Sequence, residues 1–148
     1  MINQQIPSVQ DAVTEPVPPR AGIIAESGEN YLETILIIKE RNEDGLVRAV
    51  DVANELGFSK PSVSRALGML KERGLIKIAQ SGAILFTPEG RALAENVFER
   101  HQLLTLLLKE VAKVPSDIAE HDACRIEHVI SDETMVGIRN YLTEHGLI

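Results

Sequence analysis

Two short helical segments joined by a glycine-centred turn constrain the fold of this chain more than any other sequence feature. Residues 49–56 carry Val, Ala and Leu at helical spacing, and Gly57 can supply the positive φ that ends a helix. Ser59 suits the N-cap of a second helix, and Pro61 falls near its start, where a missing N–H costs little. This helix is predicted to run to about Arg73 with its apolar residues on one face. The spacing predicts a helix-turn-helix.

A predicted hairpin follows the two helices. Gly74 ends the second helix, and residues 75–78 have the apolar character of a strand. Residues 80–82 form a turn, and residues 83–86 form the returning strand. Helix, turn, helix and hairpin in this order are typical of a winged helix-turn-helix, which reads DNA with its second helix.

Further helices make the chain mainly α. They are expected over residues 27–41, from Pro88 after a Thr87 cap to about Val111, from Pro115 to about Ile130, and from a Ser131 cap to near Gly146. The proline-rich start of the chain has little periodicity. We therefore expect a flexible tail (1–25), a winged helix-turn-helix DNA-binding domain (26–90) and a second, helical domain (91–148).

The charge distribution separates these parts. The chain carries −7, but residues 45–86 contain six basic and three acidic side chains, a net +3, which leaves −10 for the rest. A basic module beside an acidic one can bind DNA locally, and the acidic remainder can hold a cation. A single cysteine, no apolar run long enough to cross a membrane and no signal-peptide pattern indicate a cytoplasmic protein.

The start of the second helix presents the predicted DNA contacts. Arg65 could donate two parallel hydrogen bonds to a guanine edge, whereas Lys60 and Ser62 suit phosphates. The predicted DNA-binding residues are Arg48, Ser59, Lys60, Pro61, Ser62, Ser64, Arg65, Lys77 and Gln80. The simpler alternative is a solvated basic face on a small helical core, but the charge separation and the hairpin favour DNA binding.

A possible metal-ligating pattern lies in the C-terminal half. Residues 120–128 read Glu-His-Asp-Ala-Cys-Arg-Ile-Glu-His, and on a helix Cys124, Glu127 and His128 would share one face, with Glu120 one turn earlier. A thiolate, a carboxylate and an imidazole suit late first-row divalent ions better than Mg²⁺ or Ca²⁺. The alternative is structural, because a lone cysteine is usually a small buried apolar side chain. Taken alone, His101 on its apolar helix stripe favours a core residue, and Glu33 favours a surface charge.

Five motifs, in order, resemble the diphtheria toxin repressor and manganese transport regulator family. They are Ser27-Gly-Glu-Asn-Tyr-Leu-Glu-Thr-Ile, Lys60-Pro-Ser-Val-Ser, Leu85-Phe-Thr-Pro-Glu-Gly-Arg, Arg100-His-Gln-Leu-Leu and Asp122-Ala-Cys-Arg-Ile-Glu-His-Val-Ile-Ser-Asp-Glu. The resemblance covers about residues 26–145 and is most specific in the Cys-Arg-Ile-Glu-His-Val block. It implies a winged helix followed by a helical metal-binding and dimerisation domain, with Fe²⁺ or Mn²⁺ as the corepressor at promoters of metal-uptake genes.

The resemblance also implies metal ligands on three helices. The positions that match family ligands are Asn30, Glu33, His101, Cys124, Glu127 and His128. Asn30 replaces Asp of the manganese branch and Met of the iron branch, whereas Cys124 matches the iron branch and Glu33 the manganese branch. Thr105 replaces a carboxylate of an ancillary site. The set is a hybrid, and its thiolate favours Fe²⁺ by a small margin over Mn²⁺. Because the chain ends at Ile148, we expect a short form without the family's SH3-like domain.

We therefore predict a metal-dependent transcriptional repressor, not an enzyme, that binds a palindromic operator as a homodimer. Metal would clamp the first helix against the dimerisation domain and so fix the spacing of the two recognition helices. Two alternatives remain at this point. One is a metal-dependent hydrolase with Glu120 or Asp122 as the general base. The other is a winged-helix regulator that responds to a non-metal or redox signal, with Cys124 as a core residue or sensor.

Overall fold

The computed structural model describes residues 26–148, and the flexible tail expected for residues 1–25 lies outside the described residues. The elements of the described part are α1 (Glu26–Arg41), α2 (Ala49–Leu56), α3 (Lys60–Glu72), β1 (Ile76–Ile78), β2 (Ile84–Phe86), α4 (Pro88–Glu110), α5 (Ser116–Ile126) and α6 (Asp132–Glu144). The prediction of a mainly α chain, with a winged helix-turn-helix followed by a helical domain, is confirmed. None of the described helices is both long and apolar enough to span a lipid bilayer.

The helix-turn-helix forms where its capping residues predicted it. Gly57 ends α2 with a φ of 68°, in the left-handed region that favours glycine. The Ser59 hydroxyl caps α3 by accepting a hydrogen bond from the Ser62 N–H at 3.3 Å. The buried apolar residues of α3 are Val63, Leu67 and Leu70. This face anchors α3 in the core and leaves its opposite face to solvent.

The wing is a two-stranded antiparallel hairpin. Ile76 pairs with Phe86, and Ile78 pairs with Ile84. The loop before α2 joins the hairpin, because the Ile84 N–H donates to the Val47 carbonyl at 2.8 Å. Val47 and Ile84 are both almost fully buried. The hairpin is therefore held to the helices through main-chain hydrogen bonds as well as side-chain packing.

The start of α4 is locked against the junction between α3 and β1. The Thr87 hydroxyl donates to the Gly74 carbonyl at 2.6 Å and accepts from the Gly90 N–H at 3.1 Å. The Thr87 N–H donates to the Leu75 carbonyl at 3.1 Å. Gly90 packs so closely that an added Cβ would lie 1.8 Å from the Leu75 carbonyl oxygen. Only glycine fits at this position without a shift of the backbone.

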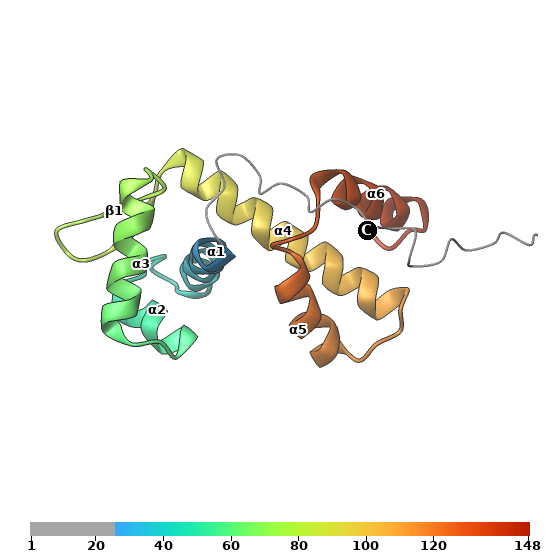
Figure 1. The fold of residues 1–148 in the computed structure, drawn as a ribbon, viewed down its shortest axis with the longest axis horizontal. Coiled ribbons are helices and arrows are strands. Elements are labelled where there is room, and N and C mark those ends of the chain that lie inside the picture. The colour runs from blue at the N-terminus through green and yellow to red at the C-terminus, as the bar shows by residue number, and fades with distance from the viewer. Residues whose placement is uncertain (1–25) are drawn as a thin grey trace, which may run out of the picture.

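Two hydrophobic clusters share α4, which runs between them as one long helix (Figure 1). The first cluster joins α1, α2, α3 and the wing to the first half of α4, where Ala94 is fully buried. The second joins the later half of α4 to α5 and α6, through Leu104, Ala123 and Leu142 among others. Helix α4 contacts α1, α5 and α6, so it connects the winged helix to the C-terminal helices.

Helix α5 ends at Ile126, four residues before the predicted end near Ile130. The Ile126 carbonyl accepts hydrogen bonds from both the Val129 N–H (3.0 Å) and the Ile130 N–H (3.1 Å), which closes a tight turn. The Ser131 hydroxyl then caps α6 by accepting from the Thr134 N–H at 3.2 Å. The expectation of one helical face over residues 124–128 is therefore wrong in part, because α5 ends at Ile126 and both Glu127 and His128 lie in the turn that follows.

Candidate metal centre and nucleic-acid interface

Helix α1 places two carboxylates inside the protein. Glu29 and Glu33 are four residues apart and lie on one helix face, so their side chains stack one turn apart. Glu29 is 3% exposed and Glu33 is 5% exposed. Carboxylates are almost never this buried unless a cation or hydrogen-bond donors compensate them. The pair therefore indicates a site where a cation or hydrogen-bond donors compensate the buried carboxylates.

The turn after α5 supplies the opposing side chains. Glu127 is 0% exposed, and the side chain of His128 is 2% exposed. The His128 Nε2 lies 3.3 Å from Glu127 Oε1, and its Nδ1 lies 3.7 Å from Glu29 Oε1. From α4, His101 places its Nδ1 2.9 Å from Glu127 Oε2. Three separate elements therefore meet at Glu127 and His128.

Glu33, Glu127 and His128 form a group that could hold a metal ion. Each residue offers one ligand atom, and these atoms all lie within 4.8 Å of one another. Burial raises the pKa of Glu33 to about 9, and the neighbouring carboxylates of Glu127 and Glu29 add to this increase. Buried like charges of this kind are stabilised when a cation joins them.

The donor set fits a divalent transition metal. Glu33 Oε2 and Glu127 Oε1 are buried, and neither has a hydrogen-bond partner among the residues that the structure describes. Buried acceptor oxygens without donors are costly, and a cation would satisfy both. Two carboxylates and an imidazole are ligands that Mn²⁺, Fe²⁺ and Zn²⁺ accept. Bound there, the ion would supply positive charge between α1 and the turn after α5.

The other predicted ligands lie outside this group of three. His101 borders it through Glu127, with its side chain 22% exposed. Asn30 is half-buried next to Glu29, and its main-chain carbonyl accepts from the Thr34 hydroxyl at 2.8 Å. Cys124 and Glu120 are exposed on α5. Their assignment as ligands stays a prediction.

Two residues of the site were missed by reasoning from sequence. The spacing of four residues between Glu29 and Glu33 places both carboxylates on one helix face, but Glu40 shares that face, so the spacing alone does not mark Glu29. Arg100 lies beside His101 and is only 3% exposed; its spacing, three residues after Val97 and four before Leu104, places it on the buried face of α4 and could have marked it. Its role depends on the turn after α5, which the sequence pattern did not predict.

The start of α3 presents a basic and polar surface. Lys60, Ser64 and Arg65 are exposed, as expected of residues that contact DNA. Ser62 is half-buried, and its hydroxyl lies 2.9 Å from that of Ser59, so these two serines also fix the start of the helix. The predicted contact residue Pro61 is exposed in the first turn of α3, where a proline is tolerated.

The remaining predicted DNA contacts lie on the wing and beside it. Lys77 is exposed on β1, and Gln80 is exposed in the turn that follows. Arg48 is exposed at the N-cap of α2, and its Nε donates to the Ser81 carbonyl at 3.2 Å. Arg48 therefore ties the start of α2 to the tip of the wing, a structural role that sequence reasoning did not assign.

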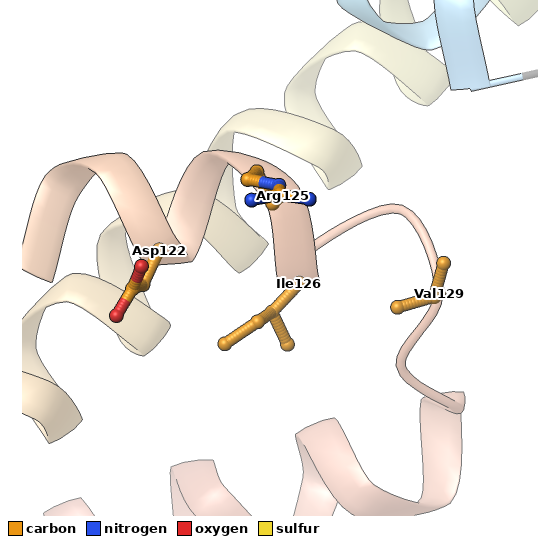
Figure 2. A pocket seen from close by; sticks show the side chains of 4 residues that line it. All are labelled: Asp122, Arg125, Ile126 and Val129. Carbon is orange, nitrogen blue, oxygen red and sulfur yellow. The ribbon is translucent and has the colours of Figure 1, made fainter.

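A pocket of about 410 Å³ opens near the end of α5, on the side chains drawn in Figure 2. Asp122, Arg125 and Ile126 line it from α5, and Val129 lines it from the following turn (Figure 2). Val129 is 73% exposed, in contrast to the fully buried Glu127 two residues earlier. The turn therefore directs the side chains of Glu127 and His128 inward and the apolar side chain of Val129 outward.

Comparison with protein families matches both halves of the chain. The model for the N-terminal DNA-binding domain of iron-dependent repressors matches residues 24–84. The model for the metal-binding and dimerisation domain of the same repressors matches residues 87–145.

Individual relatives give the same result. The transcriptional regulator MntR of Escherichia coli O6:H1 is 37% identical over 118 residues, which cover 80% of this chain and 74% of the relative. The diphtheria toxin repressor of Corynebacterium diphtheriae is 33% identical over 110 residues, which cover 74% of this chain and 48% of the relative. A solved manganese-dependent transcriptional repressor in complex with manganese superposes with a TM-score of 0.72 and 29% identity, over 78% of this chain and 52% of that one. This chain thus spans about half the length of that structure and of the solved manganese regulator SloR.

Proposed function

The chain belongs to the iron-dependent repressor family, and from this premise we propose that it is a metal-dependent DNA-binding repressor of metal-homeostasis genes. One observation carries the proposal: Glu33 of α1 and the pair Glu127 and His128 after α5 gather their ligand atoms within 4.8 Å. Helix α1 packs in the core of the winged helix, whereas α5 packs in the second cluster. A metal ion bound by residues of α1 and of the turn after α5 would fix one half of the molecule against the other.

The affinity for DNA changes only as far as the DNA-competent arrangement binds metal better than its alternatives. Without a cation, Glu33 lies beside Glu29 and Glu127 in its protonated form at neutral pH, since its pKa is about 9. A cation would displace this proton and neutralise the three carboxylates. Their neutralisation favours the arrangement in which the two elements lie close together. We propose that this arrangement sets the direction in which α3 presents Lys60 and Arg65 to the major groove.

We propose that two copies act together on a palindromic operator. The C-terminal elements expose apolar side chains that a second copy would cover, among them Val111, Ile118, Val129, Val136 and Tyr141. A two-fold dimer places its two recognition helices on half-sites about one DNA turn apart or a multiple of it. Because the proposed binding partner is operator DNA, we also propose that the protein acts in the cytoplasm.

The proposed metal is Fe²⁺ or Mn²⁺, and the sequence-based preference for Fe²⁺ depends on Cys124. The three gathered ligands offer oxygen and nitrogen, which both ions accept. A thiolate would shift the preference towards Fe²⁺, and Cys124 lies on the exposed side of α5. The test measures the anaerobic affinities of the wild type and of Cys124→Ser for Fe²⁺ and for Mn²⁺. A loss of Fe²⁺ affinity alone in Cys124→Ser supports a thiolate ligand. If Cys124→Ser binds both ions as tightly as the wild type does, the thiolate is not a ligand, and Mn²⁺ is favoured.

The proposed function is tested by DNA binding at fixed salt, first with a chelator and then with Mn²⁺ or anaerobic Fe²⁺ at matched free concentrations. We expect at least about a tenfold gain in affinity with metal, the range of ordinary allosteric coupling. Glu127→Gln should abolish the gain, whereas Glu133→Gln, which changes an exposed carboxylate of α6, should keep it. If the wild type binds DNA with the same affinity in chelator and with each metal, the proposed metal dependence is wrong.

A further inference from the structure

A buried arginine of α4 holds the turn that carries two of the proposed ligands. One terminal nitrogen of Arg100 donates to the Glu127 carbonyl at 2.8 Å and to the Ile130 carbonyl at 2.9 Å. The other terminal nitrogen donates to the carboxylate of Asp132, in the first turn of α6. Arg100 therefore joins the two ends of the turn to the start of the next helix.

Arg100 brings a charged donor to both carbonyls. The Glu127 carbonyl follows the last helical residue of α5, where carbonyls have no partner within the helix, and the N–H groups of Val129 and Ile130 are donated to the Ile126 carbonyl. A guanidinium is always charged and presents its donors in a fixed plane, so it can satisfy two carbonyls and a carboxylate at once. Asp132 supplies the countercharge that a buried arginine requires.

Adjacent residues of α4 hold Glu127 at two points. Arg100 binds its main-chain carbonyl, and His101 lies 2.9 Å from its carboxylate. The turn that Arg100 fixes also contains His128, whose side chain is 2% exposed. With the backbone of the turn held in place, both ligand side chains are directed towards Glu33 before any ion binds.

We propose that Arg100 is a positioning residue of the metal site, an inference that rests on the proposed function. It would hold the turn in the geometry that the ion requires, so less ordering is left to occur on binding. A residue that only stabilised the fold would leave the coordination of the bound ion unchanged once the protein had folded. Coordination geometry is therefore the measurement that separates the two roles.

The experiment titrates the full-length chain with Mn²⁺ for affinity and with Co²⁺ for its visible absorption spectrum. Arg100→Met should lower the affinity for both ions by about 10- to 100-fold, as is usual when a residue that orients metal ligands is lost. It should also alter the Co²⁺ absorption bands. The metal affinity of Arg100→Lys should lie between those of Arg100→Met and the wild type, because one ammonium cannot reach both carbonyls and Asp132. The matched control Arg91→Met removes an exposed arginine of the same helix, paired only with Glu95 in the described structure, and should bind as the wild type does.

Wild-type affinities and Co²⁺ bands in a folded Arg100→Met would overturn the inference and leave the proposed function intact. If Arg100→Met does not fold, Arg100→Lys decides: unchanged affinity and bands overturn the inference, and weaker binding with altered bands supports it. A wild type that binds neither ion overturns the proposed function, and the inference with it. Loss of metal binding in Arg91→Met as well would also overturn the specific role of Arg100.

Discussion

At the scale of single residues, the site is defined by carboxylates whose burial is unfavourable unless a cation or hydrogen-bond donors compensate it. Glu29, Glu33 and Glu127 are each at most 5% exposed, although carboxylates strongly prefer water. Spacing on one helix face leads to Glu127 and His128 as candidate ligands, whereas Glu33 is a candidate only through the family resemblance. The sequence could not show that Glu29 is buried beside them, or that Cys124 is exposed, because those facts depend on how α1 and the end of α5 meet.

Glu33→Gln should have opposite effects with and without metal. In a chelator at neutral pH, we expect the free energy of unfolding to rise by about 1 to 3 kcal/mol. Glu33, with its pKa of about 9, must take up a proton on folding, whereas the amide is neutral without that cost and can donate to Glu127. With saturating Mn²⁺, the stabilisation seen in the wild type should be lost, about 2.7 kcal/mol at a metal concentration 100 times the dissociation constant. Chemical denaturation under both conditions measures the two effects.

Glu40→Gln is the control for this prediction, since Glu40 lies on the same helix but is exposed. It should change neither the metal-free stability nor the effect of Mn²⁺ by more than about 0.5 kcal/mol. A Glu33→Gln protein that is less stable in chelator than the wild type would show that Glu33 contributes favourable contacts without metal.

At the scale of elements, the caps predicted from sequence begin the helices where expected. Ser59, Thr87 and Ser131 each accept a main-chain N–H at the start of a helix, because hydroxyl capping is a local interaction. The end of α5 was not predictable in the same way. No glycine or proline ends the helix there, and the turn is closed by main-chain bonds and by Arg100, which is distant in sequence.

Gly90→Ala should destabilise the winged helix. The new Cβ would meet the Leu75 carbonyl oxygen at 1.8 Å, so either α4 or the α3–β1 junction has to move. We expect a loss of about 1 to 3 kcal/mol, the usual cost of overpacking, even though alanine favours helices more than glycine does. Thermal and denaturant unfolding, followed by circular dichroism, would measure the change.

Gly137→Ala provides the matched control, because this helical glycine of α6 has nothing within 4 Å of an added Cβ. There the same substitution should raise the free energy of unfolding by about 0.5 to 1 kcal/mol. If both variants gain stability, the close packing of Gly90 against Leu75 does not exist in solution.

At the scale of the whole molecule, the proposed ligands join parts that are otherwise connected mainly by α4. Glu33 belongs to the first hydrophobic cluster's helix α1, whereas Glu127 and His128 follow α5 of the second. Among the described elements, α4 is the one that packs in both clusters. A bound ion would therefore act as a second connection between them.

Amide hydrogen exchange can detect this second connection. Mn²⁺ should slow exchange in α1 and in residues 127–130, because ligands on both are tied down, while the β1–β2 hairpin should change little. Glu127→Gln should remove the effect in both segments together. Slower exchange confined to residues 127–130 would show that α1 takes no part in binding.

The continuity of α4 has a mechanical consequence. A helix of 23 residues is roughly 34 Å long at 1.5 Å per residue, and it has no proline after its first position that would kink it. For a rigid helix of this length, a tilt of about 5° about the end beside α5 would move the opposite end by roughly 3 Å, close to the ~3.4 Å that separates successive base pairs along one strand. In the proposed function, a small displacement beside the metal ligands would therefore be enlarged to about one base-pair step on an operator.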